Sequence, residues 1–288
     1  MRTGRRKRVL RLCRAALAAE FALFSMACSR GPEQPRPSFS DEKARSLVEE
    51  AVEKAGGWER WRSFRDVSFV STLNLYDSVG TRTSSTSFFH RALLHQGLRC
   101  RVESIGRPDE IVFGFDRGES WFLHDGRPVE DTFGSAFGRF DAASGVFWLG
   151  LPFSILESRA AVRYAGESRE GARRWEKVEV RYAEEPAVPV DWAVLYLDPR
   201  TLLVRRVHAR VRAAFLPHRL WVAKWRDIRN WQGILVARRR TYFPADAEGN
   251  IVGTMAAEHL IEHVEFDRGY PEELFRKPLV AGGGSPAA

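Results

Sequence analysis

The amino-acid sequence predicts an α+β domain built on a strongly curved antiparallel sheet of about 10–11 strands, an incomplete half-barrel with helices on its concave face. From Val67 onward, apolar residues alternate with mostly polar ones, which is the pattern of strands that bury one face. Short turn sequences such as Asp125-Gly126 and Asp198-Pro199 separate these segments, and this favours an antiparallel meander over alternating strands and helices. The third observation is a stretch in the middle of the chain with aromatic residues at helical spacing. Such a stretch must pack against an apolar surface.

The first 27 residues have the composition of an export signal. Seven Arg and Lys side chains between Arg2 and Arg14 precede a short apolar stretch, Ala15–Ala27, and Cys28 follows at once. A basic N-terminal region, a short apolar core and a small residue before the cleavage site are typical of secretory signals. Their apolar core is too short to span a bilayer. The cysteine at this place resembles the lipobox of bacterial lipoproteins, and the resemblance implies that Cys28 carries a lipid after cleavage. The alternative is an amphipathic N-terminal helix that is never removed.

Removal of this segment changes what the charge implies. Residues 1–27 carry seven basic side chains against one acid, Glu20, so they hold +6 (seven minus one) of the formal +8 and the remainder keeps +2. A nearly neutral protein has no chain-wide attraction for polyanions, which argues against a nucleic-acid partner. Cys13 leaves with the signal and Cys28 is the anchor, so Cys100 has no partner for an intrachain disulfide or a cysteine-based zinc site.

Four segments follow from this division of the chain. They are a lipoprotein-type signal peptide at 1–27, the lipidated cysteine and a proline-bearing flexible tether at 28–39, one domain at 40–279 and a disordered, glycine-rich tail at 280–288.

The domain is expected to open with a helix capped by Ser40. Gly56-Gly57 ends it, because glycine is the usual residue at a left-handed C-terminal cap, and a short second turn, Trp58–Phe64, follows. The apolar stripe of the first helix is Leu47, Val48, Ala51 and Val52.

Strands are expected through most of the remaining chain. The predicted segments are Val67–Leu75, Ser84–Leu94, Leu98–Ser104, Glu110–Asp116, Ser120–His124, Ala161–Ala165, Trp175–Tyr182, Val190–Leu197, Leu202–Ala213, Leu220–Arg229, Ile234–Phe243 and Ile251–Phe266.

The segment Thr132–Glu157 interrupts the strands and is too aromatic to lie open to solvent. We expect it to cover the concave face of the sheet, where a half-open barrel can hold one elongated apolar ligand. The predicted ligand-binding residues come from this insertion and from strand tryptophans: Phe137, Phe140, Phe147, Trp148, Leu151, Phe153, Trp192, Trp221 and Trp225.

Several short segments are similar to those of a group of bacterial envelope proteins. They are Gly56–Trp61, Val146–Phe153, Asp191–Thr201, Trp225–Asp227 and Gly233-Ile234. Over most of Ala44–Pro278 the chain resembles outer-membrane lipoprotein-sorting-like proteins of the LolA/LolB-like superfamily. The resemblance implies an incomplete, curved antiparallel barrel with helices plugging its open side and a hydrophobic cleft that binds acyl chains. It brings no catalytic residues.

The segment from His259 to His263 matches H-x-x-E-H, the signature of inverted zinc metallopeptidases, with Glu262 as the base. That chemistry needs both histidines on one helical face and a third ligand well downstream. The segment is equally consistent with a strand, and only 25 residues (288 minus 263) follow it. We therefore expect no catalytic residues, metal or other cofactor, and keep a zinc-dependent hydrolase as an alternative.

Two basic stretches lie on predicted strands. Arg206, His208, Arg210 and Arg212 alternate along one face, which is either a solvated outer face, the simpler interpretation, or a patch for anionic headgroups. In Arg238-Arg239-Arg240 neighbouring residues point to opposite faces, so one arginine should face inward and need a carboxylate.

Together these patterns predict an exported, non-catalytic protein that binds a lipid or an acylated protein and is held to the membrane by its N-terminal lipid. The residue after Cys28 is Ser29 and not an aspartate. By the commonest sorting rule of lipoproteins, a protein with this residue goes to the outer membrane, where it faces the periplasm. The alternatives are an inner-membrane anchor or a soluble periplasmic protein. A structural envelope lipoprotein without a ligand is a further alternative, and the oligomeric state is left open.

Overall fold

The computed structural model describes residues 36–278 except 96, 98, 107–109, 130–131, 186–187, 214–215 and 217–218, and the side chains of 132–135 are not described. The predicted signal peptide, Cys28, most of the predicted tether and the predicted tail at 280–288 lie outside the described residues. The description that follows concerns the unit that begins at Pro35.

A single sheet forms the framework of this unit. Its strands are β1 (Ser38–Phe39), β2 (Asp66–Tyr76), β3 (Arg82–Leu93), β4 (Arg99–Ser104), β5 (Ile111–Asp116), β6 (Glu119–His124), β7 (Arg127–Pro128), β8 (Ala160–Glu170), β9 (Arg173–Tyr182), β10 (Val190–Leu197), β11 (Val204–Val211), β12 (Leu220–Trp231), β13 (Ile234–Pro244) and β14 (Ala257–Phe266).

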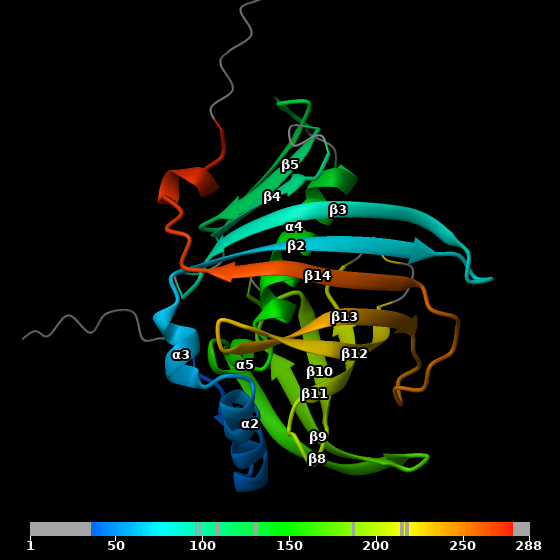
Figure 1. The fold of residues 1–288 in the computed structure, drawn as a ribbon. Helices are drawn as coiled ribbons and strands as arrows, with labels where there is room; N and C mark the ends of the chain where they lie inside the picture. Colours follow the sequence, from blue (N-terminus) through cyan, green and yellow to red (C-terminus); the bar gives the residue numbers. More distant parts are fainter. Residues whose placement is uncertain are drawn as a thin grey trace, which may run out of the picture. The chain divides into compact units, whose positions relative to one another are not determined.

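The order of these strands joins two sequential runs. It is β1-β8-β9-β10-β11-β12-β13-β14-β2-β3-β4-β5-β6-β7, so β14 near the end of the chain pairs with β2 near its start. The pairings are antiparallel except that of β1 with β8. The edge strands β1 and β7 are not paired with each other in the described part of the chain, and the sheet curves without closing (Figure 1). The predicted fold class, a curved antiparallel sheet with few helices, is confirmed, but the described sheet has 14 strands where about 10–11 are predicted, because the two-residue edge strands β1 and β7 are too short to give an alternation pattern.

The N-terminal cap of the opening helix, α2 (Glu42–Lys54), lies one residue later than predicted. Asp41 and not Ser40 is the cap, and its carboxylate accepts the N–H of Ala44 at 2.8 Å. Gly56 follows the helix at φ 135°, and a Cβ there would lie 2.4 Å from the carbonyl oxygen of Gly233. Glycine is therefore required both by the backbone conformation and by the close approach to the β12–β13 turn. Helix α3 (Trp58–Ser63) comes next.

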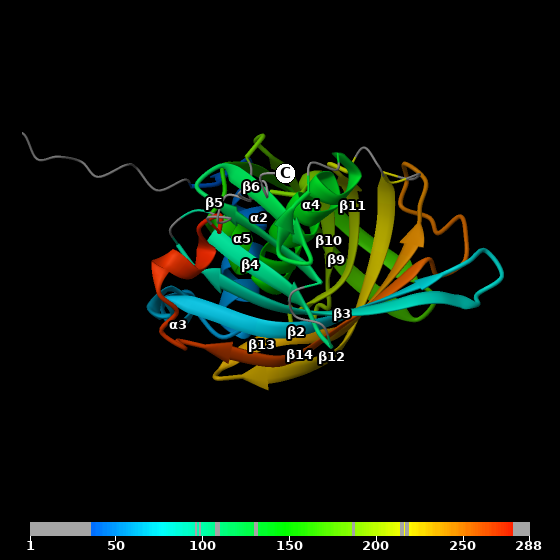
Figure 2. The same cartoon turned by 90° about the horizontal axis from the view of Figure 1, so that it is seen from above.

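The central insertion forms α4 (Thr132–Leu149) and α5 (Phe153–Leu156), and a short helix, η1 (Glu272–Phe275), lies near the C-terminus. Helix α4 touches strands from both runs of the sheet. The ring of Phe147 meets Tyr182 of β9 at 5.3 Å between centroids, and Gly138 lies against Phe113 of β5. One helix reaches strands so far apart in sheet order because the sheet curves around it, and Figure 2 shows α4 and α5 inside this curve. Within the described ranges, no helix is both long and apolar enough to cross a membrane.

One predicted strand begins too early. The segment predicted as Ile251–Phe266 is a strand only from Ala257, and Ile251 makes an isolated bridge to Ala245. The preceding residues form a turn in which the Asp246 carboxylate accepts two backbone N–H groups of this loop, at 3.1 Å and 2.7 Å. A side chain that satisfies the local backbone competes with strand pairing.

Candidate functional site

Helix α4 approaches the sheet closely because one side of it carries small residues. A Cβ at Gly138 would lie 3.1 Å from the Phe113 side chain, and one at Gly145 would lie 3.1 Å from His90 Nδ1. Ala142, between them in sequence, is fully buried. Residues spaced by three or four share a helical face, so this face seats α4 in the hollow of the sheet.

Four of the nine predicted ligand-binding residues are buried in the core: Phe147, Leu151, Phe153 and Trp225. The Phe153 ring stacks on Trp61 with centroids 4.8 Å apart. Side chains enclosed by their own protein offer little surface to a ligand. The three from the insertion hold α4 and α5 in place.

Four others lie on the concave side of the sheet. Phe140, Trp148 and Trp221 are partly buried and pack on one core cluster, which also contains the buried Trp225. Phe137 is partly buried further along α4, where it packs against β5. The structure therefore brings the helix aromatics and two strand tryptophans to the same hollow.

Trp192 is not brought to this hollow. Its neighbour Ala193 is in the core cluster, so Trp192 faces the opposite, outer side of β10. There its ring meets His208 edge-on at 4.8 Å between centroids. Because this strand is apolar on both sides, the sequence pattern does not distinguish the two faces.

A row of three register partners crosses the concave face. Trp225 of β12 pairs with Arg240 of β13, and Arg240 pairs with His259 of β14. Arg240 is 1 % exposed, and its guanidinium carbon lies 4.6 Å from the centroid of the Trp225 ring. With Trp148 and Tyr242, these residues are called the interior cluster below. Arg240 is the inward-facing arginine that the sequence predicts, but no carboxylate among the described residues pairs with it.

Arg240 caps the end of α4. Its Nη2 donates to the carbonyl oxygen of Trp148 at 3.2 Å. In a continuing helix that carbonyl would accept from residue 152, which is Pro152 and has no N–H. A cation at a helix C-terminus is also favoured by the helix dipole. The Nε of Arg240 has no hydrogen-bond partner in the described part of the chain, so a buried donor is left over.

Burial controls the charge of the other titratable groups near the hollow. It lowers the pKa of His90 to about 3, and burial followed by the positive charge of Arg240 lowers the pKa of His259 to about 3. Burial also raises the pKa of the Asp141 carboxyl to about 7. Both histidines are therefore neutral at physiological pH, Asp141 is partly ionised, and Arg240 is positively charged.

One nucleophile–base pair occurs next to α4. Ser71 Oγ and His90 Nε2 lie 2.7 Å apart, and both residues are 1 % exposed. A catalytic pair needs substrate access and a third group that orients the base, but here α4 covers the pair at Gly145 and His90 Nδ1 has no partner among the described residues. The pair is a buried hydrogen bond between β2 and β3.

The H-x-x-E-H segment lies on strand β14 and not on a helix. His259 is on the concave side, whereas His263 is exposed at φ 52°, beside a break in the strand register. Glu262 forms an ion pair with Arg238. The helical face that the zinc motif requires is therefore not formed, and the described residues contain no group of three His, Cys, Asp or Glu that could hold a metal ion.

The basic stripe on β11 is engaged with acids and with a loop. Arg210 and Arg212 both contact Asp191, at 3.4 Å and 2.8 Å, and Arg206 pairs with an acid at the end of β8 at 3.2 Å. His208 is buried, and its Nε2 lies 3.1 Å from a loop carbonyl after β13. This outer face is thus a set of ion pairs instead of an open cationic patch.

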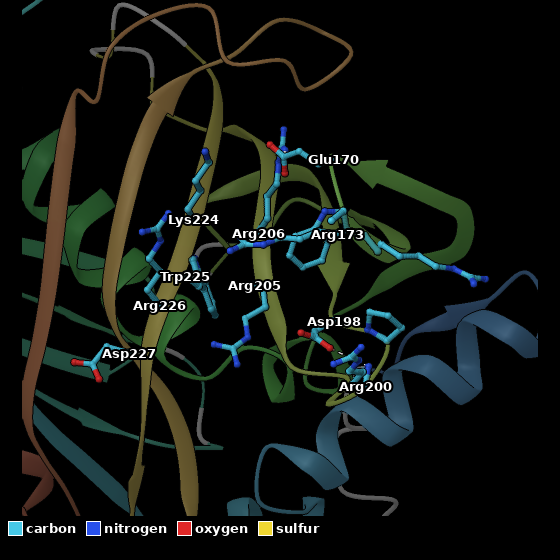
Figure 3. Close-up of a pocket in the computed structure, with 14 residues that line it drawn as sticks. Glu170, Arg173, Asp198, Arg200, Arg205, Arg206, Lys224, Trp225, Arg226 and Asp227 are labelled. Carbon is cyan, nitrogen blue, oxygen red and sulfur yellow. Dashed lines mark hydrogen bonds and ion pairs between the residues drawn. The ribbon is translucent and has the colours of Figure 1, made fainter.

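A pocket opens where β12 separates from β11 (Figure 3). Register pairing between the two strands stops at Arg206 and Lys224, whereas β12 continues to Trp231 and there pairs with β13 alone. The pocket has a volume of about 990 Å³ and is lined by residues of the β8–β9 hairpin, the β10–β11 turn, β11 and β12. Seven of its lining residues are Arg or Lys and three are acids. Sequence reasoning missed this site because its residues come from four separate segments.

Three solved structures share the fold of this chain. They are an outer membrane lipoprotein-sorting protein domain from Vibrio parahaemolyticus (13% identity, 81% of this chain and 96% of that chain, TM-score 0.50), a LolA superfamily protein from Nitrosomonas europaea (10%, 81% and 97%, TM-score 0.53) and a DUF1329 family protein from Desulfovibrio piger (11%, 82% and 98%, TM-score 0.51). No protein-family model and no curated protein matches the chain. At these identities the similarity defines the fold, and it confirms the LolA-like fold that the sequence resemblance implies.

Proposed function

We propose that this chain, which has a LolA-like fold, is a lipid-anchored envelope protein that binds a lipid or the acyl chains of a lipoprotein in the hollow of a half-barrel. It does so without covalent chemistry. The observation that carries the proposal is the aromatic helix α4 inside the curve of the sheet, with Phe140, Trp148 and Trp221 only partly buried there. Each acyl methylene moved from water into such a site contributes about 0.8 kcal/mol, so a long chain binds without polar specificity.

The attachment of α4 suits a cover that moves. Its buried side meets the sheet through Gly138, Ala142 and Gly145, which fill little volume. Its C-terminal end is held by the hydrogen bond from Arg240 to the Trp148 carbonyl and by the buried side chains of Phe147 and Leu149. Release of the ligand then requires α4 to shift or an acceptor that buries the chain better.

Two observations favour binding over the zinc-hydrolase alternative. The motif that suggested zinc lies on a strand with its glutamate in an ion pair, and the Ser71–His90 pair is buried beneath α4. The structures with this fold are described as a lipoprotein-sorting domain and a LolA superfamily protein, and these names support a role in binding acylated molecules.

Trp148→Ala tests the proposal against a structural protein with a filled interior. Truncating a tryptophan in a filled core costs about 3–5 kcal/mol. In a cover above a ligand site part of its contact is with the ligand, so we expect a loss below about 2 kcal/mol and a clear change in affinity for a neutral apolar probe, N-phenyl-1-naphthylamine. Urea unfolding and fluorescence titration of the full chain measure the two quantities.

Trp192→Ala is the matched control, because Trp192 is also partly buried but lies on the outer face. We expect it to leave the probe affinity unchanged. A severe loss of stability in Trp148→Ala, together with no binding of probe or lipid by the natural protein, would support the structural envelope lipoprotein instead.

The proposed anchor is tested at Cys28. If Cys28 is lipidated, Cys28→Ala should move the protein out of the outer-membrane fraction and leave the signal uncleaved, whereas Cys13→Ala within the signal should leave both unchanged. Membrane fractionation and mass measurement of the N-terminus give the result. A natural protein that begins at Met1 and stays in the cytosol would contradict export and anchoring together.

A further inference from the structure

We propose that the pocket between β11 and β12 binds the anionic headgroup of an acyl lipid, and that the acyl chain passes Trp225 to reach the hollow. This inference rests on the proposed function and names its ligand class. The lipid carries a net negative headgroup. The headgroup lies in the pocket outside the sheet, and the acyl chain passes between β11 and β12 to the hollow beneath α4.

The first argument is the geometry of the opening. From Trp225 to Trp231, β12 has no register partner on its β11 side. Across the gap, Leu197 of β10 pairs with Val204 whereas Tyr196 pairs with Arg206, so Arg205 is the extra residue of a bulge. Figure 3 shows Arg205 and Trp225 reaching into the space between the two strands. The wall of the sheet is thus interrupted at a cation and an aromatic ring.

The second argument is uncompensated positive charge. Five cations that line the pocket form no ion pair among the described residues: Arg173, Arg200, Arg205, Lys224 and Arg226. Like charges gathered around a concave space raise the local potential and attract an anion.

The acids of the pocket do not cancel this charge, because each has other partners. Glu170 pairs with Arg206 at 3.2 Å, and the Asp198 carboxylate accepts backbone N–H groups of its own turn. Asp227 is shared between Arg229 and Arg238, at 2.8 Å and 3.1 Å. The five cations are therefore not neutralised by these acids and can attract an added anion, although the Lys224 Nζ also lies over the Phe243 ring, 5.2 Å from its centroid.

The third argument is the position of Trp225, which belongs to the pocket lining and to the interior cluster at once. The Arg240 guanidinium carbon lies 4.6 Å from the centroid of the Trp225 ring. The Trp148 ring packs edge-on against the Trp225 ring, with centroids 6.4 Å apart. Cationic side chains outside and aromatic rings inside match a molecule with an anionic head and an apolar chain. A small anion alone would use only the outer half of this arrangement.

The experiment compares two lipids with the same acyl chain, lysophosphatidylglycerol with net charge −1 and zwitterionic lysophosphatidylcholine. Both are titrated into the full chain below their micelle concentrations, at low and at high salt. We expect the anionic lipid to bind about tenfold more tightly at low salt and this preference to shrink at high salt, because salt screens exposed charges. Glycerophosphoglycerol, which has the same singly charged phosphodiester group and no acyl chain, should bind far more weakly.

The test variant is Arg205→Gln/Lys224→Gln/Arg226→Gln, and Arg226→Gln alone is the milder version. The matched control is Arg82→Gln/Arg127→Gln/Arg219→Gln, which removes three exposed cations elsewhere. The pocket variant should lose about tenfold in affinity for the anionic lipid, the size expected for two or three exposed ion pairs, and little for the zwitterionic one. The control should lose neither.

Each outcome separates this inference from the function on which it rests. Equal affinity for the two lipids, or equal behaviour of pocket and control variants, would overturn the headgroup site while leaving acyl binding intact. Glycerophosphoglycerol binding as tightly as the lipid would make the pocket a small-anion site and overturn the inference. No binding of either lipid or of the apolar probe would overturn the proposed function itself.

Discussion

Replacing Gly145 with valine is expected to lift α4 from the hollow and to lower the free energy of unfolding by about 3 kcal/mol. A Cβ at this position lies 3.1 Å from His90 Nδ1 and 3.4 Å from Phe69 Cζ, before any further methyl groups are added. Neither ring has room to move, because both are buried and they stack on each other with centroids 4.4 Å apart. The helix must therefore move instead of the sheet.

The two parts of this result are measured separately. Urea unfolding gives the loss of stability, and titration with N-phenyl-1-naphthylamine reports on the hollow, which should bind more probe once α4 is displaced. Ala136→Val, at an exposed position of the same helix, is the control and should change neither quantity by much. A Gly145→Val protein with natural stability and natural probe binding would mean that α4 is not seated where the structure has it.

Asp141→Asn is expected to stabilise the protein above pH 7 and to have little effect near pH 4. Burial raises the pKa of the folded-state carboxyl to about 7, from an ordinary value of 3.8. Below pH 4 the carboxyl is protonated in both states and contributes nothing to pH dependence. Between pH 4 and 7 the unfolded chain gives up its proton first, so this group makes the natural protein less stable as pH rises. Above pH 7 both states are ionised and the penalty is constant.

The upper limit of the effect is set by the difference between the folded-state pKa of about 7 and the ordinary value of 3.8, which corresponds to at most about 4 kcal/mol. Oδ2 of the carboxylate is buried without a partner among the described residues, but Asp141 as a whole is only partly buried, so we expect about 2–3 kcal/mol after partial hydration is allowed for. Urea unfolding of both proteins at pH 4, 6 and 8 gives the difference directly. The control is Asp125→Asn in an exposed turn, and a constant difference between Asp141→Asn and the natural protein at all three pH values would contradict the assignment.

The strands could be predicted from the sequence because alternation of apolar and polar residues reports burial of one face. The same signal does not say where a strand starts when a loop also carries apolar residues, and β14 therefore begins at Ala257 and not at Ile251. It also does not separate the two faces of a strand that is apolar on both. For this reason the sequence pattern places Trp192 in the hollow with Trp225, whereas in the structure Trp192 packs on His208 on the outer face.

The site could be predicted only in part because its chemistry depends on contacts between distant segments. Alternation indicates that one of Arg238, Arg239 and Arg240 faces inward, but the expectation of a carboxylate partner fails. Arg240 is held by an aromatic face and by a helix carbonyl that Pro152 leaves without a donor. The lateral pocket has no local signature at all, since its cations are unremarkable where each stands in the chain and gather only after folding.

The hairpin of β12 and β13 is bound to its neighbours at both its base and its tip. Five register pairs tie it to β11 and four tie it to β14, all near its base. Its tip is hydrogen-bonded to the end of α2 and to the end of β14. The Leu235 N–H donates to the Ala55 carbonyl at 2.8 Å, and the Phe266 N–H donates to the Gln232 side chain at 2.7 Å. Between its base and its tip, the hairpin forms one side of the opening between β11 and β12. The end of α2 and the end of β14 are therefore hydrogen-bonded directly to the tip of the hairpin that borders the opening, while the base of the hairpin stays paired with β11 and β14.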